Sequence, residues 1–551
     1  MGQQINVVMA QLNLSVGDID ANTSLIIENA KKAIEEYSAD LIVFPELALT
    51  GYPPEDLLFR PSLSIRIAKA LQRIRDEKLA ANLVIGYPER ADGKLYNSLA
   101  IVGGGELLAN YRKQFLPNYQ VFDERRYFDS GSEPCLLDIL GMKVAFTICE
   151  DMWEKEPVQQ ARAAGAQLMI NINASPFHRN KLLERQALLA QRAGQGGFPI
   201  IYVNMVGGQD ELVFDGGSMA VAATGEVRCL AASFEESLVA VQIEENADPN
   251  GPWQIPLQSI APALSLEAQV YQSLVLGVRD YVQKNKFKGV VLGLSGGIDS
   301  ALTLAIAVDA LGSDRVQAVM MPFTYTSKLS LDVAAEQAIK LGVDYQQISI
   351  EGVYSEFMQA LAPQFASLDA DVSEQNLQAR CRGVILMAIS NKKGLLVLTT
   401  GNKSEIAVGY STLYGDMAGG FDVLKDVSKT LVYALARYRN NEYSDQADEI
   451  IPQQVIDRAP SAELAPDQLD QDSLPPYDVL DQILELYVEN DQSATAIIAR
   501  GFEEQVVRHV LRLVDLNEYK RRQSPIGVRL TQRGFGRDRR YPITNAWPIG
   551  D

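Results

Sequence analysis

Residues 289–300 read Gly-Val-Val-Leu-Gly-Leu-Ser-Gly-Gly-Ile-Asp-Ser, and this stretch decides the fold. Gly289 to Leu294 are almost entirely apolar, which is typical of a strand buried on both faces of a parallel sheet. Ala301 to Leu311 follow and are rich in strong helix formers. A buried strand, a glycine loop and a helix in this order predict one unit of an α/β fold.

The glycine loop, residues 293–300, has the chemistry of a phosphate-binding loop. Glycines let the backbone approach a ligand closely with its N–H groups pointing inward, and a helix N-terminus adds partial positive charge. The loop is not a Walker A loop, because Gly-Lys-Ser/Thr does not follow it. The plainer alternative is a glycine turn with Asp299 or Ser300 as the N-cap of the helix.

The pattern Ser-Gly-Gly-x-Asp-Ser at residues 295–300 resembles the PP-loop of ATP pyrophosphatases, which cleave ATP to AMP and pyrophosphate. The resemblance implies ATP contacts from Gly293, Leu294, Ser295, Gly296, Gly297, Ile298, Asp299 and Ser300. It also implies that Asp299 ligates Mg²⁺ at the phosphates, since hard cations prefer carboxylate oxygens.

Outward from this loop, helix-like and strand-like segments alternate. A long helix is predicted from Ser265 to Asn285, and apolar segments recur at Val316–Met321 and Leu395–Thr399. This alternation is typical of a doubly wound parallel sheet. The basic run from Lys520 to Arg540 is either a solvated face or a phosphate-binding segment.

The first part of the chain carries a second set of short apolar strands. Strands are predicted at Ile5–Leu12, Leu41–Phe44, Leu83–Tyr87, Ser98–Val102, Lys143–Ile148, Leu168–Ile172, Ile200–Asn204 and Val239–Ile243, with a helix at Thr23–Tyr37. This pattern predicts a layered α/β domain with buried sheets. A polar stretch rich in proline and glycine follows. We therefore predict domains at 1–245 and 263–551, joined by a linker at 246–262.

Composition narrows the function classes. The 551 residues include 50 Lys and Arg against 70 Asp and Glu, a net charge of −20, which argues against a non-specific nucleic-acid or anionic-membrane binder. The two histidines, His178 and His509, exclude a three-His zinc site. We interpret both as surface or satisfied structural residues. Without a secretory signal or a run of apolar residues long enough to span a membrane, a cytoplasmic protein is expected.

Four further segments of the second part of the chain are informative when they are taken together in this order. They are residues 376–382, 399–405, 410–416 and 460–464. Together with the PP-loop they resemble the NAD synthetase family over about residues 261–551. The resemblance implies ATP contacts from Thr400, Lys429 and Ser461, Mg²⁺ ligation by Asp299 and Glu405, and deamido-NAD contacts from Asn376, Arg380, Glu405 and Lys520.

Taken singly, these residues have plainer alternatives. Glu405 is equally suited to cap a helix, Arg380 to pair with a carboxylate, and Lys520 to lie in solvent. Ammonia-dependent members of the family tend to carry Lys where this chain has Leu413, so no role is inferred for that position.

Three polar residues follow or interrupt apolar segments in the first part of the chain. Glu46 ends Leu41-Ile42-Val43-Phe44-Pro45-Glu46, Lys113 lies in Tyr-Arg-Lys-Gln-Phe-Leu-Pro, and Cys149 ends the strand 143–148. A cysteine at a strand-to-helix turn presents its sulfur beside backbone N–H groups. A buried structural cysteine, a helix-start carboxylate and a surface ammonium are the plainer alternatives.

Jointly, these segments resemble the Glu-Lys-Cys triad of the nitrilase superfamily over about residues 5–243, which implies an α-β-β-α sandwich. Glu46 is then the general base and Cys149 the nucleophile on an amide carbon. Lys113 and a backbone N–H, that of Glu150 being one candidate, hold the oxyanion. The resemblance also implies glutamine-binding residues at Tyr119, Ser175 and Lys181, although Tyr119 is also consistent with a core aromatic and Lys181 with an exposed side chain.

The two halves together resemble a glutaminase fused to a synthetase that consumes its ammonia. The implied partners are L-glutamine, ATP, Mg²⁺ and deamido-NAD, in a homo-oligomer formed through the synthetase domains, with neither nucleic acid nor membrane. Two alternatives stay open: another PP-loop ligase or RNA-modifying enzyme that takes nitrogen from glutamine, and a non-catalytic protein with inactive sites.

Overall fold

The structure is a computed structural model that describes residues 3–248, 251–443, 449–461, 463–465, 468, 470–472, 474–548 and 550. The chain divides into two compact units, Met1–Gln209 with Val213–Ala263, and Asp210–Leu212 with Leu264–Asp551. Pro249 and Asn250 of the predicted linker and Ala462 of the segment 460–464 lie outside the described residues.

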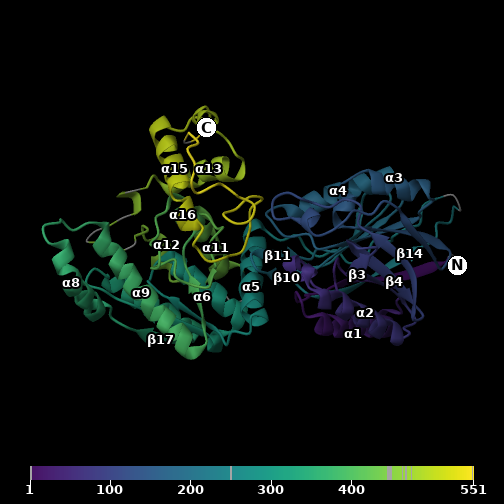
Figure 1. The fold of residues 1–551 in the computed structure, drawn as a ribbon, viewed down its shortest axis with the longest axis horizontal. Helices are drawn as coiled ribbons and strands as arrows, with labels where there is room; N and C mark the ends of the chain where they lie inside the picture. The colour runs from purple at the N-terminus through teal and green to yellow at the C-terminus, as the bar shows by residue number, and fades with distance from the viewer. Residues whose placement is uncertain are drawn as a thin grey trace. The chain divides into compact units, whose positions relative to one another are not determined.

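The first unit contains two six-stranded sheets in the part of the chain that the structure describes, in the orders β14-β1-β2-β3-β4-β5 and β13-β12-β9-β8-β7-β6. Helices α1 and α2 cover one sheet and α3 and α4 the other, so the unit is an α-β-β-α sandwich (Figure 1). The strands of the first sheet are β1 (Gln4–Gln11), β2 (Leu41–Val43), β3 (Asn82–Ala91), β4 (Lys94–Gly103), β5 (Glu106–Arg112) and β14 (Ser237–Glu244). The second sheet contains β6 (Cys135–Ile139), β7 (Met142–Ile148), β8 (Leu168–Asn173), β9 (Ile200–Asn204), β12 (Met219–Val221) and β13 (Val227–Leu230).

The other elements of this unit complete the layers. They are the helices α1 (Ile19–Tyr37), α2 (Pro61–Asp76), α3 (Glu156–Ala163) and α4 (Lys181–Gly196), the hairpin β10 (Val206–Gln209) and β11 (Leu212–Asp215), and the short helices η1 (Glu55–Phe59), η2 (Glu124–Arg126) and η3 (Cys149–Met152).

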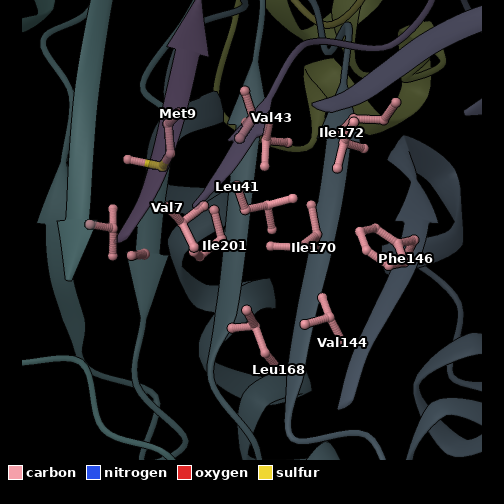
Figure 2. Close-up of a cluster of buried hydrophobic side chains, with 14 of the residues drawn as sticks. Val7, Met9, Leu41, Val43, Val144, Phe146, Leu168, Ile170, Ile172 and Ile201 are labelled. Atoms are coloured by element: carbon pink, nitrogen blue, oxygen red, sulfur yellow. The ribbon is translucent and has the colours of Figure 1, made fainter. Parts of the chain in front are cut away.

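The core of the unit lies between the two sheets. Alternate side chains of a strand point to opposite faces, so one set of each sheet faces the other sheet and the next set faces the helices. Figure 2 shows the inner set, in which Val7, Met9, Leu41 and Val43 of one sheet meet Val144, Phe146, Leu168, Ile170, Ile172 and Ile201 of the other. This burial on both faces explains why the strands are apolar throughout.

Part of the predicted linker packs on the first unit. Trp253 and Ile255 are buried in the core between the sheets. Gln254 forms an isolated β-bridge with Glu244, and Ile260 forms one with Leu230. The apolar side chains within 246–262 account for this, since burying them is favourable.

The second unit is built on a sheet of parallel strands in the order β17-β16-β15-β18-β19. The strands are β15 (Val290–Gly293), β16 (Val316–Met320), β17 (Asp344–Gln347), β18 (Leu396–Thr399) and β19 (Phe421–Asp422). The helices around the sheet are α5 (Leu266–Lys284), α6 (Ile298–Leu311), α7 (Lys328–Leu341), α8 (Glu351–Phe365), α9 (Val372–Lys393), α10 (Lys403–Val408), α11 (Lys429–Asn441) and α12 (Gln453–Asp457), with the single turn η4 (Ser313–Arg315). The predicted doubly wound parallel sheet is confirmed.

A cluster of helices follows the parallel sheet and has its own apolar core, which includes Leu480, Ile483, Val507 and Val510. It consists of η5 (Asp470–Asp472), α13 (Tyr477–Leu484), the π-helix η6 (Glu485–Glu489), α14 (Ala494–Ile498), α15 (Glu504–Leu516) and α16 (Glu518–Arg521). Of the helices described, none is long and apolar enough to cross a membrane.

Candidate active sites

Cys149 lies at a sharp turn at the end of a buried strand. β7 ends at Ile148, and Cys149 begins η3 with a φ of 43°. This left-handed conformation is strained for a residue with a Cβ and persists only where the surrounding structure enforces it. The side chain is 5% exposed. The predicted strand-to-helix turn therefore places a buried thiol at the carboxyl end of β7.

Glu46 and Lys113 form a buried ion pair. Lys113 directly follows β5, and its Nζ donates to Glu46 Oε1 at 2.7 Å with both side chains 0% exposed. Asn97 Nδ2 donates to the same oxygen at 2.7 Å, and the Ala174 N–H donates to Oε2 at 2.9 Å. Both oxygens of the carboxylate are thus held. The predicted apolar strand before Glu46 ends earlier, at Val43, and a turn carries Glu46.

Glu124 is a fourth member of this cluster that sequence reasoning missed. Lys113 Nζ donates to Glu124 Oε1 at 2.9 Å, and Tyr52 Oη donates to the same oxygen at 2.9 Å. Its segment, Asp-Glu-Arg-Arg at 123–126, has the composition of an exposed charged run, so nothing in the pattern marks one carboxylate as buried. Burial is the main reason that the pKa of Glu124 is raised to about 7, with Lys113 opposing and Glu46 adding to the rise.

The charges define what each group can do. Burial on its own lowers the pKa of Lys113, but Glu124 and Glu46 raise it well above its usual value, so the amine stays protonated. Burial and the Glu46 charge raise the pKa of the Cys149 thiol well above its usual value. A thiol in this state needs a base at the moment of attack, and Lys113 is not able to be that base.

The side chains of Tyr119, Ser175 and Lys181 differ in how exposed they are to solvent. Tyr119 is 48% exposed, so it is not a core aromatic, and its hydroxyl donates to Glu150 at 3.0 Å. Both residues line an open pocket of about 730 Å³. Ser175 is buried, and its N–H donates to Asn204 Oδ1 at 2.9 Å.

Lys181 begins α4 and is mostly buried. Its Nζ donates to Glu184 at 3.2 Å and lies 4.1 Å from the centre of the Trp153 ring. His178 is also buried, with Nδ1 at 2.9 Å from the Arg179 carbonyl oxygen, whereas His509 is exposed on α15. Both positions fit the interpretation of these histidines as surface or satisfied structural residues.

The glycine loop of residues 293–300, called the phosphate-type loop from here on, lies where β15 leads into α6 in the second unit. Gly297 is the N-cap of α6, so Asp299 and Ser300 lie in its first turn and neither is the N-cap. Gly296 has a φ of 82°, and a Cβ there would lie 2.5 Å from the Ser330 carbonyl oxygen, which makes glycine necessary. Ser300 Oγ accepts from the Ser295 N–H at 3.2 Å and closes the loop.

Two carboxylates converge on one cation beside this loop. Lys429 Nζ lies 2.7 Å from Asp299 Oδ2 and 2.9 Å from Glu405 Oε1. Asn402, the N-cap of α10, donates to Asp299 Oδ1 at 2.8 Å. Burial raises the pKa of Glu405 to about 7 against the opposing charge of Lys429. Asn402, not Glu405, is the N-cap of α10.

The remaining predicted contacts lie on neighbouring segments of the second unit. Asn376 Oδ1 accepts from Thr412 Oγ1 at 2.8 Å, and Arg380 Nε donates to the Leu413 carbonyl oxygen at 3.3 Å. Lys520 Nζ donates to the carbonyl oxygens of Gly409 and Ser411 at 2.8 and 2.9 Å. Lys520 is therefore not simply solvated, and Arg380 does not pair with a carboxylate among these contacts.

Ser461 and Thr400 complete the predicted set. Ser461 Oγ donates to the Gln468 carbonyl oxygen at 2.5 Å and is partly buried. Thr400 directly follows β18, at the carboxyl end of the strand beside β15. The ends of parallel strands meet at one edge of a sheet, so Thr400 and the phosphate-type loop share that edge.

Known proteins match the chain over its whole length. It is 49% identical to a glutamine-dependent NAD(+) synthetase from Acinetobacter baylyi over 556 aligned residues, covering 100% of both chains. The corresponding protein of Xylella fastidiosa is 48% identical, with 99% of this chain and 100% of the relative covered. The chain belongs to the glutamine-dependent NAD(+) synthetase family.

Two family models divide the chain as the two units do. The carbon-nitrogen hydrolase model matches residues 6–248, which include Glu46, Lys113 and Cys149. The NAD synthase model matches residues 270–524, which include the phosphate-type loop. A solved glutamine-dependent NAD(+) synthetase of Acinetobacter baumannii, in complex with adenosine diphosphate, is 47% identical with a TM-score of 0.80 over 100% of both chains. A member of the family from Cytophaga hutchinsonii, 20% identical with a TM-score of 0.84 over 99% of this chain and 98% of its own, shares the fold.

Proposed function

We propose that the chain makes NAD from deamido-NAD, with glutamine as the nitrogen donor and ATP cleaved to AMP and pyrophosphate. The observation that carries the proposal is one chain with two sites of complementary chemistry. The buried Glu46–Lys113 pair lies close enough to Cys149 for both charges to affect the pKa of its thiol, and the Asp299–Lys429–Glu405 cluster lies at a phosphate-type loop. The domain limits 1–245 and 263–551 are part of the proposal.

The first site is suited to hydrolyse glutamine. Glu46 takes the proton of Cys149 as the sulfur attacks the amide carbon, and Lys113 with a backbone N–H stabilises the oxyanion. The proton passes to the leaving nitrogen, ammonia departs and a thioester remains. Water activated by Glu46 then releases glutamate. Glu124 supports this chemistry because it keeps Lys113 charged while Glu46 exchanges its proton.

Glutamine recognition falls to Tyr119, Ser175 and Lys181. The ammonium group of Lys181 has the charge to bind the α-carboxylate of glutamine. Burial lowers the pKa of Lys181. Tyr119 and Glu150 together present a hydroxyl and a carboxylate at the pocket, which suits the α-ammonium group.

Changing Lys181 to Met tests this assignment. The change removes the charge and keeps most of the side chain, so we expect KM for glutamine to rise about 10- to 100-fold from the loss of a charge-assisted hydrogen bond. Steady-state NAD formation at varied glutamine is the measurement, and the rate with ammonium salt serves as the internal control. Lys143→Met, a change at an exposed lysine of β7, is the matched variant. An unchanged KM in Lys181→Met contradicts the assignment.

The second site is suited to bind ATP and activate the nicotinate carboxylate. The loop Gly293–Ser300 holds phosphates through backbone N–H groups and the α6 N-terminus, and Thr400, Lys429 and Ser461 are the further contacts in the proposal. Asp299 and Glu405 fit Mg²⁺, because both carboxylates already converge on a cationic group and hard cations take carboxylate oxygens. Asp299 and Glu405 would hold the ion, and it would supply positive charge to neutralise pyrophosphate.

Deamido-NAD contacts are assigned to Asn376, Arg380, Glu405 and Lys520. A homo-oligomer through the synthetase domains is also part of the proposal. Exposed apolar side chains on α8 and α9 are consistent with it, since association surfaces are built from apolar side chains that gather into a patch. They are Val353, Phe357, Val372, Val384 and Met387, which are 37–63% exposed.

The test is a substrate assay on the wild-type protein with Mg-ATP and deamido-NAD. We expect NAD, AMP and pyrophosphate in equal amounts with glutamine or with an ammonium salt, and glutamate only with glutamine. A matched reaction with bulk tRNA in place of deamido-NAD addresses the RNA-modifying alternative. Turnover of ATP that depends on RNA, with no NAD formed from either donor, overturns the proposal.

A further inference from the structure

Asp151 joins the two segments that carry Lys113 and Cys149. It lies two residues after Cys149 and is 0% exposed. One carboxylate oxygen accepts from the N–H groups of Gln114 and Phe115 at 3.0 and 2.9 Å, immediately after Lys113. The other accepts from the Ile148 N–H at 3.0 Å, immediately before Cys149, and from Tyr111 Oη at 2.7 Å.

This bridge matters because the sheets alone leave the two segments unconnected. Lys113 follows β5, an edge strand of one sheet, and Cys149 follows β7 of the other sheet. Among the described strands, β5 and β7 are not paired by a backbone ladder. Their mutual position therefore depends on side-chain contacts, and Asp151 bonds the backbone of both segments.

The hydrogen bonds of Asp151 hold the backbone next to Lys113 and next to Cys149, where the direction of each side chain is set. The Gln114 N–H belongs to the peptide unit that begins at the Lys113 carbonyl, so its direction follows the backbone of Lys113. The Ile148 N–H lies one residue before the left-handed turn of Cys149. A strained turn needs such contacts to hold it.

We propose that Asp151 is a positioning residue that sets Lys113 at the distance and angle from Cys149 that oxyanion stabilisation requires. The inference rests on the proposed glutaminase function. A carboxylate suits the place because all four of its partners are donors. An asparagine has one acceptor oxygen, and its NH₂ group faces donors, so Asp151→Asn leaves at least one buried N–H without a partner.

The variant Asp151→Asn tests the role. Since a displacement of about 1 Å at a catalytic group costs up to about 100-fold, we expect kcat with glutamine to fall about 10- to 100-fold. KM for glutamine is expected to stay within about twofold, because Tyr119, Ser175 and Lys181 are not bonded to Asp151 in the contacts described. NAD formation with ammonium salt is expected to be unchanged, which shows that the synthetase unit is intact. The retained KM for glutamine is the sign that the unit holding Asp151 is folded.

Two further variants make the result decisive. Asp138→Asn is the matched control, an exposed carboxylate on β6 that also accepts a backbone N–H, from Gly141 at 2.8 Å. Tyr111→Phe removes a single donor to Asp151 and is expected to lower kcat with glutamine by a smaller factor. If Asp151→Asn does not fold, the kcat of Tyr111→Phe with glutamine tests the positioning role of Asp151 in its place.

Three outcomes overturn the inference: kcat with glutamine is retained, KM rises alone, or the glutamine and ammonium rates fall together. Failure of the proposed function looks different, because the wild type then forms no NAD with glutamine.

Discussion

In the Cys149→Ala variant, NAD formation with glutamine is expected to fall by about 10⁴-fold or more, while formation with ammonium salt stays within about twofold of the wild type. The first effect follows because alanine has no atom that can form the thioester. The second follows because the proposed site of the synthetase chemistry, the Asp299–Lys429–Glu405 cluster, lies in the other unit of the chain. The measurement is initial-rate NAD formation at saturating ATP and deamido-NAD.

The matched control is Cys229→Ala, which removes the thiol of another buried cysteine in the same unit. Its glutamine-dependent rate is expected to stay close to that of the wild type. Retention of glutamine-dependent synthesis in Cys149→Ala contradicts the assignment of the nucleophile. Loss of both rates in that variant contradicts the separation of the two chemistries.

The sequence predicts many of the strands that are buried on both faces, and it misses others, such as the largely exposed β5 and β17. The segments around β7, β8 and β15 are short apolar runs between polar turns, and each forms the expected strand within one or two residues. Burial rather than propensity sets this pattern, which is why it is legible without a structure. The sequence does not predict the packing of residues 253–260 on the first unit, because a proline-rich polar stretch is equally typical of a free linker.

The sequence identifies three candidate residues of the first site, but neither their geometry nor the further members of the cluster. Glu46, Lys113 and Cys149 come from three separate segments, and only a resemblance to a known family groups them before the fold is known. Nothing in the sequence predicts the left-handed backbone of Cys149, because glycine and asparagine are the residues that usually adopt it. Glu124 and Asp151 are hidden for a related reason, since a carboxylate in a loop carries no periodicity that reveals burial.

A second large effect is expected for Asp299→Asn, and it differs in kind from the first. The amide keeps the shape of the side chain but removes the charge that pairs with Lys429 and that suits Mg²⁺. Both the glutamine-dependent and the ammonium-dependent rates of NAD formation are expected to fall about 10²- to 10³-fold, as for loss of a group that stabilises charge in the transition state. Glutamate release, measured without ATP and deamido-NAD, is expected to stay within about twofold.

The pairing of the two variants separates the two chemistries within one chain. Cys149→Ala removes the nitrogen source and leaves the acceptor chemistry, so added ammonium restores the product. Asp299→Asn removes the acceptor chemistry, so ammonium restores nothing. Asp314→Asn is the matched control, since this exposed carboxylate lies beyond the opposite end of α6 from the loop. If ammonium rescues Asp299→Asn, then Asp299 acts on the supply of nitrogen, and its assignment to the ATP and Mg²⁺ site is wrong.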